Sequence, residues 1–279
     1  MGIVESFAQI CVGLLPQRVH ARGGSVEGFG FVFYKEMGAG HMIWGLVSYA
    51  KKGQWQRLLN QLKALFPRST GWVVNNCEGE AAEGEIQGDN AQFEFGGYRI
   101  LCEKMAALNG PYVIMNDTLF RTHSTRGWMK LLRGIPGHQN ESAHCVYGDI
   151  RYDGEALAER SNPFLASWIF VIPNKTSLMA FKQILCEVLQ EETLLLSPEY
   201  EAFLASWIEP KSGWRGWHGA SSEAEKARKR QCIVWEHRLS LRLLASGMDL
   251  RSLGEWDPGL YRWLRIADRL KTRWKAWMG

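Results

Sequence analysis

Tyr112-Val-Ile-Met-Asn-Asp-Thr-Leu119 is the stretch of this chain that most restricts its fold. Its apolar first half is typical of a buried β-strand, and the strand pattern stops abruptly at Asn116, Asp117 and Thr118. Open α/β folds place ligand-binding groups where buried strands leave the sheet. A single Asp among small polar residues at such a point suits a divalent cation that carries phosphates.

The segments before this stretch alternate between strand-like and helix-like patterns. Strands are predicted at residues 28–35 and 72–76. Helices are predicted at residues 42–66, with a break at Gly53, and at residues 97–108, and a polar loop at residues 77–90. This succession predicts an α/β layer with mostly parallel strands.

The second half of the chain is less regular. Strands are predicted at residues 145–151 and 166–172, and the predicted helices span residues 127–132, 176–191, 198–207, 223–245 and 258 to the end. A loop rich in Gly, Trp and Ser over residues 211–222 is long enough to be a mobile lid. We expect a catalytic domain at residues 1–220 and a helical, basic, Trp-rich C-terminal region at residues 221–279.

Composition restricts the class of protein further. With 279 residues, of which 46% are hydrophobic, the chain is long enough to bury a full core. The six cysteines are scattered without a CxxC pair, which argues against a disulfide framework and a zinc site and favours reduced, cytosolic thiols. Because the sequence has no apolar run of membrane-spanning length and no secretory signal, we expect a cytoplasmic protein.

Three polar motifs follow one another in the first half of the chain. Asn75-Asn76 ends one predicted strand, Asn90-Ala-Gln-Phe-Glu-Phe-Gly-Gly97 begins a helix, and Asn116-Asp117-Thr118 ends the next strand. In this order and spacing, residues 28–120 resemble a GT-A glycosyltransferase of the kind that assembles bacterial surface polysaccharide or lipopolysaccharide.

The resemblance implies a GT-A-like nucleotide-binding core that holds a nucleotide-sugar donor. It implies that Asp117 binds a Mn²⁺ or Mg²⁺ ion bridging the donor diphosphate, with Asn116 and Thr118 beside it. It also implies that Asn75, Asn76 and Asn90 line the donor pocket. Glu94 is a candidate contact to the donor sugar, or else an exposed glutamate before a helix.

The motif at Asp117 departs from the family pattern. It holds one carboxylate where a DXD motif has two, which leaves weaker compensation for a divalent cation. The developing charge of the leaving diphosphate could instead be neutralised by Arg121, His123 or Arg126. Taken alone, the motif also fits a simple capped turn. Gly96-Gly97 either lets backbone approach a sugar or phosphate, or lets a helix start close to the sheet.

An inverting sugar transfer needs a base near the acceptor hydroxyl. Asp149, which shares a strand and turn with Asp153, is the first candidate, and Glu236, which stands next to His237 in a predicted helix, is the second. For each, a structural role is an equal alternative. His138 and His144 have no spacing that fits a metal site and are expected to be surface or core residues.

The C-terminal helix carries an amphipathic pattern. Its apolar face holds Leu260, Trp263, Leu264, Ala267, Leu270, Trp274, Trp277 and Met278, while Arg262, Arg265, Arg269 and Arg273 line another face. This pattern is typical of an interfacial helix on anionic lipid, so residues 258–279 are expected to reach a membrane surface. Packing on the domain or on a second subunit is the alternative.

Together these patterns predict an enzyme, an inverting, hexosyltransferase-like glycosyltransferase. Its acceptor would be a glycan or a lipid-linked molecule, and the protein would be peripheral on the inner face of the cytoplasmic membrane. The main rival is a non-enzymatic binding protein whose basic, Trp-rich tail contacts nucleic acid or a protein partner. The helical spacing of the aromatic residues and the lack of a nucleic-acid-binding motif argue against nucleic acid.

Overall fold

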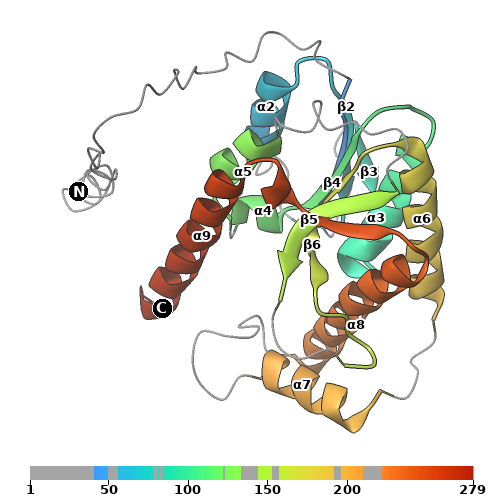
Figure 1. Ribbon diagram of the computed structural model, residues 1–279, viewed down its shortest axis with the longest axis vertical. Coiled ribbons are helices and arrows are strands. Elements are labelled where there is room, and N and C mark those ends of the chain that lie inside the picture. The colour runs from blue at the N-terminus through green and yellow to red at the C-terminus, as the bar shows by residue number, and fades with distance from the viewer. Residues whose placement is uncertain are drawn as a thin grey trace, which may run out of the picture. The chain divides into compact units, whose positions relative to one another are not determined.

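The computed structural model describes residues 41–49, 56–77, 81, 84–121, 123–132, 144–152, 157–191, 196–209 and 222–278. In these residues a seven-stranded mixed sheet is covered by helices on both faces (Figure 1). The predicted α/β class, with a mostly parallel sheet and C-terminal helices, is confirmed, and it is consistent with a GT-A-like core. The predicted strand at residues 28–35 and the loop at residues 211–221 lie outside the described residues.

The strands of the sheet range from three to nine residues in length. They are β1 (Ile43–Ser48), β2 (Thr70–Asn75), β3 (Glu85–Gln87), β4 (Tyr112–Asn116), β5 (Cys145–Arg151), β6 (Phe164–Ile172) and β7 (Asp249–Ser252). The helices are α2 (Gln56–Leu65), α3 (Phe93–Met105), α4 (Thr118–Arg121), α5 (Thr125–Leu131), α6 (Lys175–Gln190), α7 (Pro198–Ile208), α8 (Glu223–Ala245), the 3₁₀ helix η2 (Leu253–Glu255) and α9 (Pro258–Met278).

The strand order is β3-β2-β1-β4-β6-β5-β7, and of these seven strands only β6 runs against the others. The chain passes from β1 outward through β2 to β3 and then returns to place β4 on the opposite side of β1. The connections that leave β1 and β4 therefore diverge, which makes this position the topological switch point of the sheet. Ligands of open α/β sheets bind outside the carboxyl ends of the strands at such a point.

Two apolar cores cover the two faces of the sheet. Helices α3, α6 and α8 pack on one face, and α2, α5 and α9 on the other (Figure 1). Every residue of β1 and of β4 is buried, as expected for strands covered on both sides. This double burial explains why both strands read as unbroken apolar runs rather than as alternating ones.

The prediction of one helix over residues 42–66 is wrong. Residues Ile43–Ser48 form the central strand β1, and the helix of this segment is α2, Gln56–Leu65. A short, continuous apolar run satisfies helical spacing as well as a fully buried strand does, so periodicity alone does not separate the two. The β-branched and aromatic residues of Ile43-Trp-Gly-Leu-Val47 were the signal for a strand.

Two glycines let helix α3 lie close to β1. A Cβ atom on Gly97 would lie 2.6 Å from Cγ2 of Val47, and one on Gly45 would lie 2.6 Å from Cδ2 of Leu101. At these distances a larger residue at either position would force the neighbouring side chains to move. Of the two interpretations of Gly96-Gly97, the structure therefore supports close packing of the helix on the sheet for Gly97.

The C-terminal region contributes to the same sheet and core. Strand β7 pairs in parallel with β5, helix α8 packs on the face that also carries α3 and α6, and α9 packs against α5. The four-residue strand β7 was not predicted within the helical region 221–279, because so short a segment carries little periodicity. No helix in the described part of the chain is long and apolar enough to cross a membrane.

Candidate functional site

Asp117 joins the carboxyl ends of β1 and β4. Its backbone N–H donates to the carbonyl of Val47 at 3.0 Å, and its Oδ2 accepts a hydrogen bond from the backbone N–H of Tyr49 at 2.9 Å. Asp117 is buried, with 1% of its surface exposed. The carboxylate singled out in the sequence therefore lies at the switch point of the sheet, where this class of fold binds ligands.

The first residue of helix α3 lies beside these strand ends. The side-chain amide of Asn76 donates to the hydroxyl of Tyr49 at 3.3 Å and to the carbonyl of Phe93 at 2.9 Å. The rings of Tyr49 and Phe93 are 6.5 Å apart between centroids. Burial, and next the charge of Glu94, raise the pKa of Tyr49, so its hydroxyl stays protonated and can donate a hydrogen bond.

The backbone at the start of α3 is strained. Phe93 has φ 49°, in the left-handed region that residues other than glycine rarely adopt, whereas Asn90, with φ 53°, is of a residue type that tolerates this region. Such strain costs on the order of 1–3 kcal/mol per residue and clusters at ligand sites. Oδ1 of Asn90 is also buried without a hydrogen-bond partner in the described part of the chain. This segment therefore offers an acceptor to a ligand next to the switch point.

The other amides predicted for the donor pocket are bound within the protein. The side chain of Asn75 donates to Oε2 of Glu85 at 2.9 Å. Asn116 donates to the hydroxyl of Tyr98 at 2.8 Å and accepts from the backbone N–H of Thr118 at 3.0 Å. Asn116 thus caps the turn into α4, as the capped-turn interpretation of the motif expects. These contacts make Asn75 and Asn116 supports for the neighbouring side chains.

A second group of carboxylates gathers around Ser167. The backbone N–H of Ser167 donates to Oε1 of Glu236 at 2.5 Å, and its hydroxyl donates to Oε1 of Glu94 at 3.4 Å. Its carbonyl accepts from the hydroxyl of Tyr98 at 2.5 Å. Extending the register of β4 and β6 by two residues places Ser167 level with Asp117. The carboxylate of Glu236, which projects from helix α8, therefore contacts the part of β6 that neighbours the strand end at Asp117.

The environment of Glu236 raises the pKa of its carboxyl group. Burial raises the pKa of its carboxyl group, and the nearby charge of Glu94 adds to that effect, while hydrogen bonds from Ser167 and the charge of Lys229 oppose it. A carboxylate with a raised pKa holds a proton more strongly and accepts one more readily at neutral pH.

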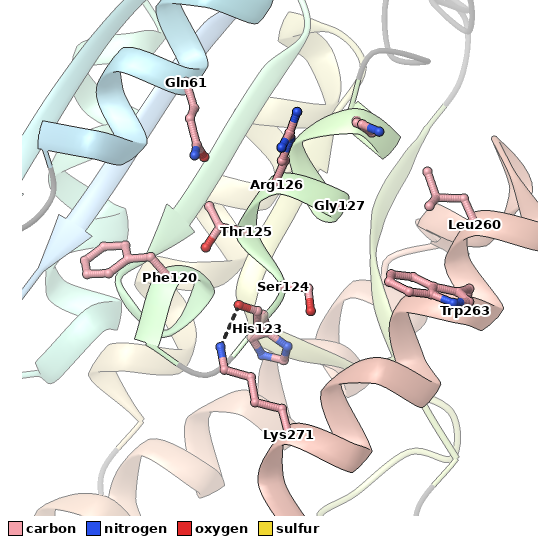
Figure 2. Close-up of a pocket in the computed structure, with 11 residues that line it drawn as sticks. Gln61, Phe120, His123, Ser124, Thr125, Arg126, Gly127, Leu260, Trp263 and Lys271 are labelled. Carbon is pink, nitrogen blue, oxygen red and sulfur yellow. Dashed lines mark hydrogen bonds between the residues drawn. The ribbon is translucent and has the colours of Figure 1, made fainter. Parts of the chain in front are cut away.

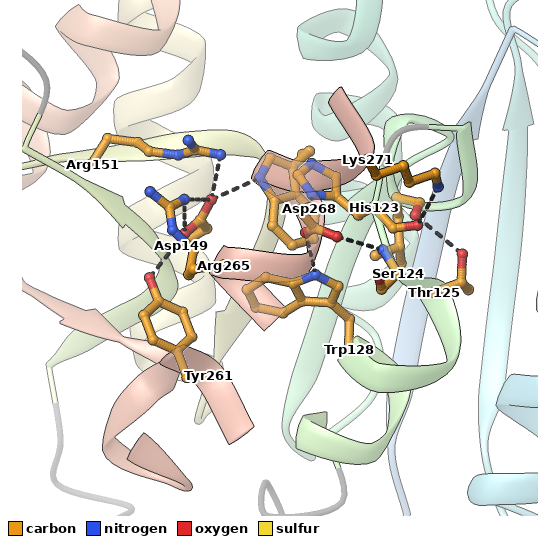
Figure 3. A network of polar contacts seen from close by, with 12 residues as sticks. His123, Ser124, Thr125, Trp128, Asp149, Arg151, Tyr261, Arg265, Asp268 and Lys271 are labelled. Atoms are coloured by element: carbon orange, nitrogen blue, oxygen red, sulfur yellow. Dashed lines mark hydrogen bonds and ion pairs between the residues drawn. The ribbon is translucent and has the colours of Figure 1, made fainter. Parts of the chain in front are cut away.

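Asp149, the first candidate for base, is held in a structural network (Figure 3). Both carboxylate oxygens accept from Arg265 at 2.8 Å, Oδ1 accepts from Tyr261 at 2.9 Å, and Oδ2 accepts from Trp168 at 3.2 Å. Arg151 adds an ion pair at 2.7 Å, and Asp149 is fully buried. These contacts tie α9 to the sheet, so Glu236 is the stronger candidate for base.

A second carboxylate, Asp268 of α9, binds the segment between α4 and α5. It accepts from Nδ1 of His123 at 2.7 Å, from Ser124 N–H at 2.8 Å and from the indole of Trp128 at 2.9 Å (Figure 3). Burial by itself raises the pKa of Asp268, but the hydrogen bonds from these groups outweigh it and hold the pKa below its usual value. His123 also stacks on Trp168 at 4.0 Å between centroids.

A cleft of about 870 Å³ lies between α2, α5 and α9 (Figure 2). Its basic lining side chains are His123, Arg126, Lys130 and Lys271, and its other lining residues are Gln61, Phe120, Ser124, Thr125, Gly127, Leu260 and Trp263. Among the described residues, the lining holds four basic side chains, the aromatic rings of Phe120 and Trp263, and no carboxylate. Of the cationic residues proposed from sequence, His123 and Arg126 face this cleft.

The position and chemistry of Asp117 suit one mode of divalent-cation binding. Mg²⁺ is often held by one or two carboxylates together with substrate phosphates, and a lone carboxylate at the switch point fits that mode. Within the described residues, no group of three or more His, Cys, Asp or Glu side chains could hold a metal ion by itself. His144 is exposed, whereas His138 and Asp153 lie outside the described residues.

Several residues of this region were not predicted from sequence. Tyr49, Tyr98 and Ser167 carry no motif; strand pairing brings Tyr49 and Ser167 to the site, and packing of α3 on the sheet brings Tyr98. Asp268 had a usable signal, because it is the only acid among six basic residues between positions 260 and 278. An acid retained on a strongly basic helix suggests a buried partner.

His237, the neighbour of Glu236, predicts a pH dependence of stability. It is buried, and its Nδ1 lies 2.7 Å from the hydroxyl of Tyr200. Burial, and next the charge of Arg160, lower its pKa to about 3. Since the unfolded chain takes up a proton near pH 6.5 and the folded chain does not, stability should fall by about 1.4 kcal/mol per pH unit below pH 6.

This pH effect can be measured by urea unfolding at pH 7.0 and pH 5.0. In His237→Gln the part of the pH dependence due to this residue should disappear, although the variant is less stable at pH 7.0. An unchanged slope between the two pH values in His237→Gln would show that His237 does not titrate as described.

Comparison with known proteins gives no match: no family model, curated protein or solved structure is significantly similar to this chain.

Proposed function

We propose that this protein is a glycosyltransferase that moves a sugar from a nucleotide-sugar donor to an acceptor hydroxyl. The observation that carries the proposal is the position of Asp117 and Tyr49 at the switch point of a mostly parallel sheet. The strained segment from Asn90 to Phe93, with its unpaired acceptor, lies beside them and supports a ligand site.

The donor would lie across the carboxyl ends of β2, β1 and β4. Oδ1 of Asn90 would accept a hydrogen bond from the nucleoside, and Asn76 would keep Tyr49 and Phe93 in place beside it. The diphosphate would lie near Asp117, which with Thr118 next to it would hold a Mg²⁺ or Mn²⁺ ion. When bound, that ion would neutralise the charge that develops on the leaving diphosphate.

Glu236 would act as the base of an inverting displacement. The acceptor hydroxyl oxygen attacks the anomeric carbon, the bond from that carbon to the diphosphate oxygen breaks, and the nucleoside diphosphate leaves with the electron pair. Glu236 takes the hydroxyl proton, and Ser167 holds its carboxylate by the 2.5 Å hydrogen bond. Glu94 would contact the donor sugar. The hydroxyl of Ser167 donates to Glu94 at 3.4 Å and so holds its carboxylate close to Glu236.

The acceptor would be a glycan or a lipid-linked molecule of surface polysaccharide assembly, reached at the inner face of the cytoplasmic membrane. In α9, four large apolar side chains recur at steps of three and four residues and are more than half exposed: Trp263, Ile266, Leu270 and Trp274. We call this set the α9 stripe. Exposed Arg262 and Arg269 flank it, and this combination suits a helix on an anionic bilayer.

A panel of nucleotide sugars tests the proposal. Because water can replace the acceptor, we expect at least one donor to release nucleoside diphosphate, measured enzymatically. Asp117→Asn retains an oxygen for the Tyr49 N–H but loses the charge, so the rate of release should fall by about 10² or more. The exposed variant Asp257→Asn is the control. If no nucleotide sugar released nucleoside diphosphate, or if Asp117→Asn released it at the wild-type rate, the result would count against the site.

A further inference from the structure

The cleft between α2, α5 and α9 has the chemistry of an anion site. His123, Arg126, Lys130 and Lys271 line it, and within the described part of the chain no carboxylate does, although Asp268 lies behind His123 and fixes that ring. Arg126 and Lys130 are exposed, and among the described residues neither has an acidic partner. Two cations at i and i+4 on one helix face repel each other unless an anion lies between them.

The same cleft is continuous with an apolar surface. Trp263 lines the cleft (Figure 2) and is also the first residue of the α9 stripe, and Lys271, which also lines the cleft, follows Leu270 of the stripe in the sequence. Gly127 lets α9 pack closely on α5, because a Cβ atom there would overlap Cδ2 of Leu264 and would force that side chain to move. One helix therefore presents cations to the cleft and an apolar row beside it.

The cleft is also next to the donor site. The chain turns from Asp117 through α4 into the cleft wall at Phe120, and the backbone N–H of Phe120 donates to the carbonyl of Asp117 at 3.2 Å. Only a few residues therefore separate the carboxylate at the switch point from the cationic side chains that begin at His123.

We propose that this cleft binds the phosphate of a lipid-linked acceptor, whose hydrocarbon chain lies along the α9 stripe. Phosphate suits a group of Arg, Lys and His donors, and a hydrocarbon chain suits a row of Trp, Ile and Leu. Calling the lipid the acceptor rests on the proposed glycosyltransferase function, whereas binding of the lipid phosphate does not.

Isothermal titration calorimetry of the full chain with three probes tests this assignment. Farnesyl phosphate, which carries both groups, should bind at least about tenfold more tightly than farnesol or inorganic phosphate, which carry one each. Arg126→Ala/Lys130→Ala should weaken farnesyl phosphate binding about tenfold or more. The control pair Lys104→Ala/Lys175→Ala removes two exposed cations from α3 and α6, on the other face of the sheet, and should leave binding unchanged.

Trp263→Ala and Leu270→Ser, at exposed stripe positions, should weaken farnesyl phosphate binding but not that of inorganic phosphate. Equal affinity for farnesyl phosphate and inorganic phosphate would assign the cleft to a free phosphate, and equal affinity for farnesyl phosphate and farnesol would remove phosphate recognition. Either result would overturn the proposal.

Two further outcomes would also overturn it. If Arg126→Ala/Lys130→Ala lost affinity for a nucleoside diphosphate instead of farnesyl phosphate, the cleft would belong to the donor. If Leu270→Ser changed the oligomeric state without changing lipid affinity, the stripe would bind a second copy. Farnesyl phosphate binding by a chain that binds no nucleoside diphosphate would overturn only the proposed transferase function and would support the lipid-phosphate site.

Discussion

Glu236→Gln is expected to slow nucleoside diphosphate release from the preferred nucleotide sugar by about 10² to 10⁴-fold, the usual contribution of a positioned base. Glutamine keeps an oxygen for the Ser167 N–H, which donates to Glu236 at 2.5 Å, but cannot take the acceptor proton. Donor affinity should stay the same, since the loss occurs in the transition state. Initial rates over a range of donor concentrations separate the two quantities.

The pH profile gives this prediction a second readout. Because burial raises the pKa of Glu236, the wild-type rate should fall on acidification at a higher pH than an ordinary glutamate would cause. That acidic limb should be missing in Glu236→Gln. At neutral pH the variant should also be at least as stable as wild type, because it no longer buries a charge.

Glu187→Gln, an exposed change on α6, is the matched control and should behave like wild type. A Glu236→Gln variant with wild-type rate and pH profile would remove Glu236 from the mechanism.

Asp149→Ala is expected to cost about 3–5 kcal/mol of unfolding free energy, the range for removing one member of a buried ion pair. The change leaves Arg265 and Arg151, whose side chains are 17% and 27% exposed, without their common carboxylate. Tyr261 and Trp168 also lose an acceptor. Since Tyr261 and Arg265 belong to α9, that helix should separate from the sheet first. Urea unfolding measures the cost.

Asp249→Ala is the control for this experiment. Asp249 is 69% exposed on β7 and pairs with Arg251 at 3.5 Å, so its loss should cost less than about 1 kcal/mol. Asp149→Asn distinguishes the structural role from the catalytic one proposed from sequence. A folded, stable Asp149→Asn variant that has lost donor turnover would make Asp149 the base and contradict its structural role.

Those features of the fold that depend on local pattern could be predicted from the sequence. The strand that ends at Asn116 was visible because a long apolar run meets three polar residues. Strand β1 was mistaken for helix because burial on both faces removes the alternation that marks a strand. The reversed direction of β6 has no local signal, since it is set by pairing with β4 and β5.

The candidate site was predicted only in part for the same reason. Asp117 could be found because it ends a strand, whereas the pairing of Ser167 with Glu236 depends on how α8 packs on β6. Asp149 looked available for catalysis because its partners in α9 are more than a hundred residues away in the sequence. The chemistry of a carboxylate is decided by such distant neighbours.

Thermal unfolding with a set of nucleoside diphosphates, each with and without Mg²⁺ or Mn²⁺, tests the central claim most directly. A ligand present at a hundred times its dissociation constant stabilises the folded state by about 2.7 kcal/mol, so at least one nucleoside diphosphate should raise Tm by several degrees. The rise should be lost in Asp117→Asn and kept in Asp257→Asn. A Tm that no nucleotide changes, with or without metal, would contradict a nucleotide-sugar site at Asp117.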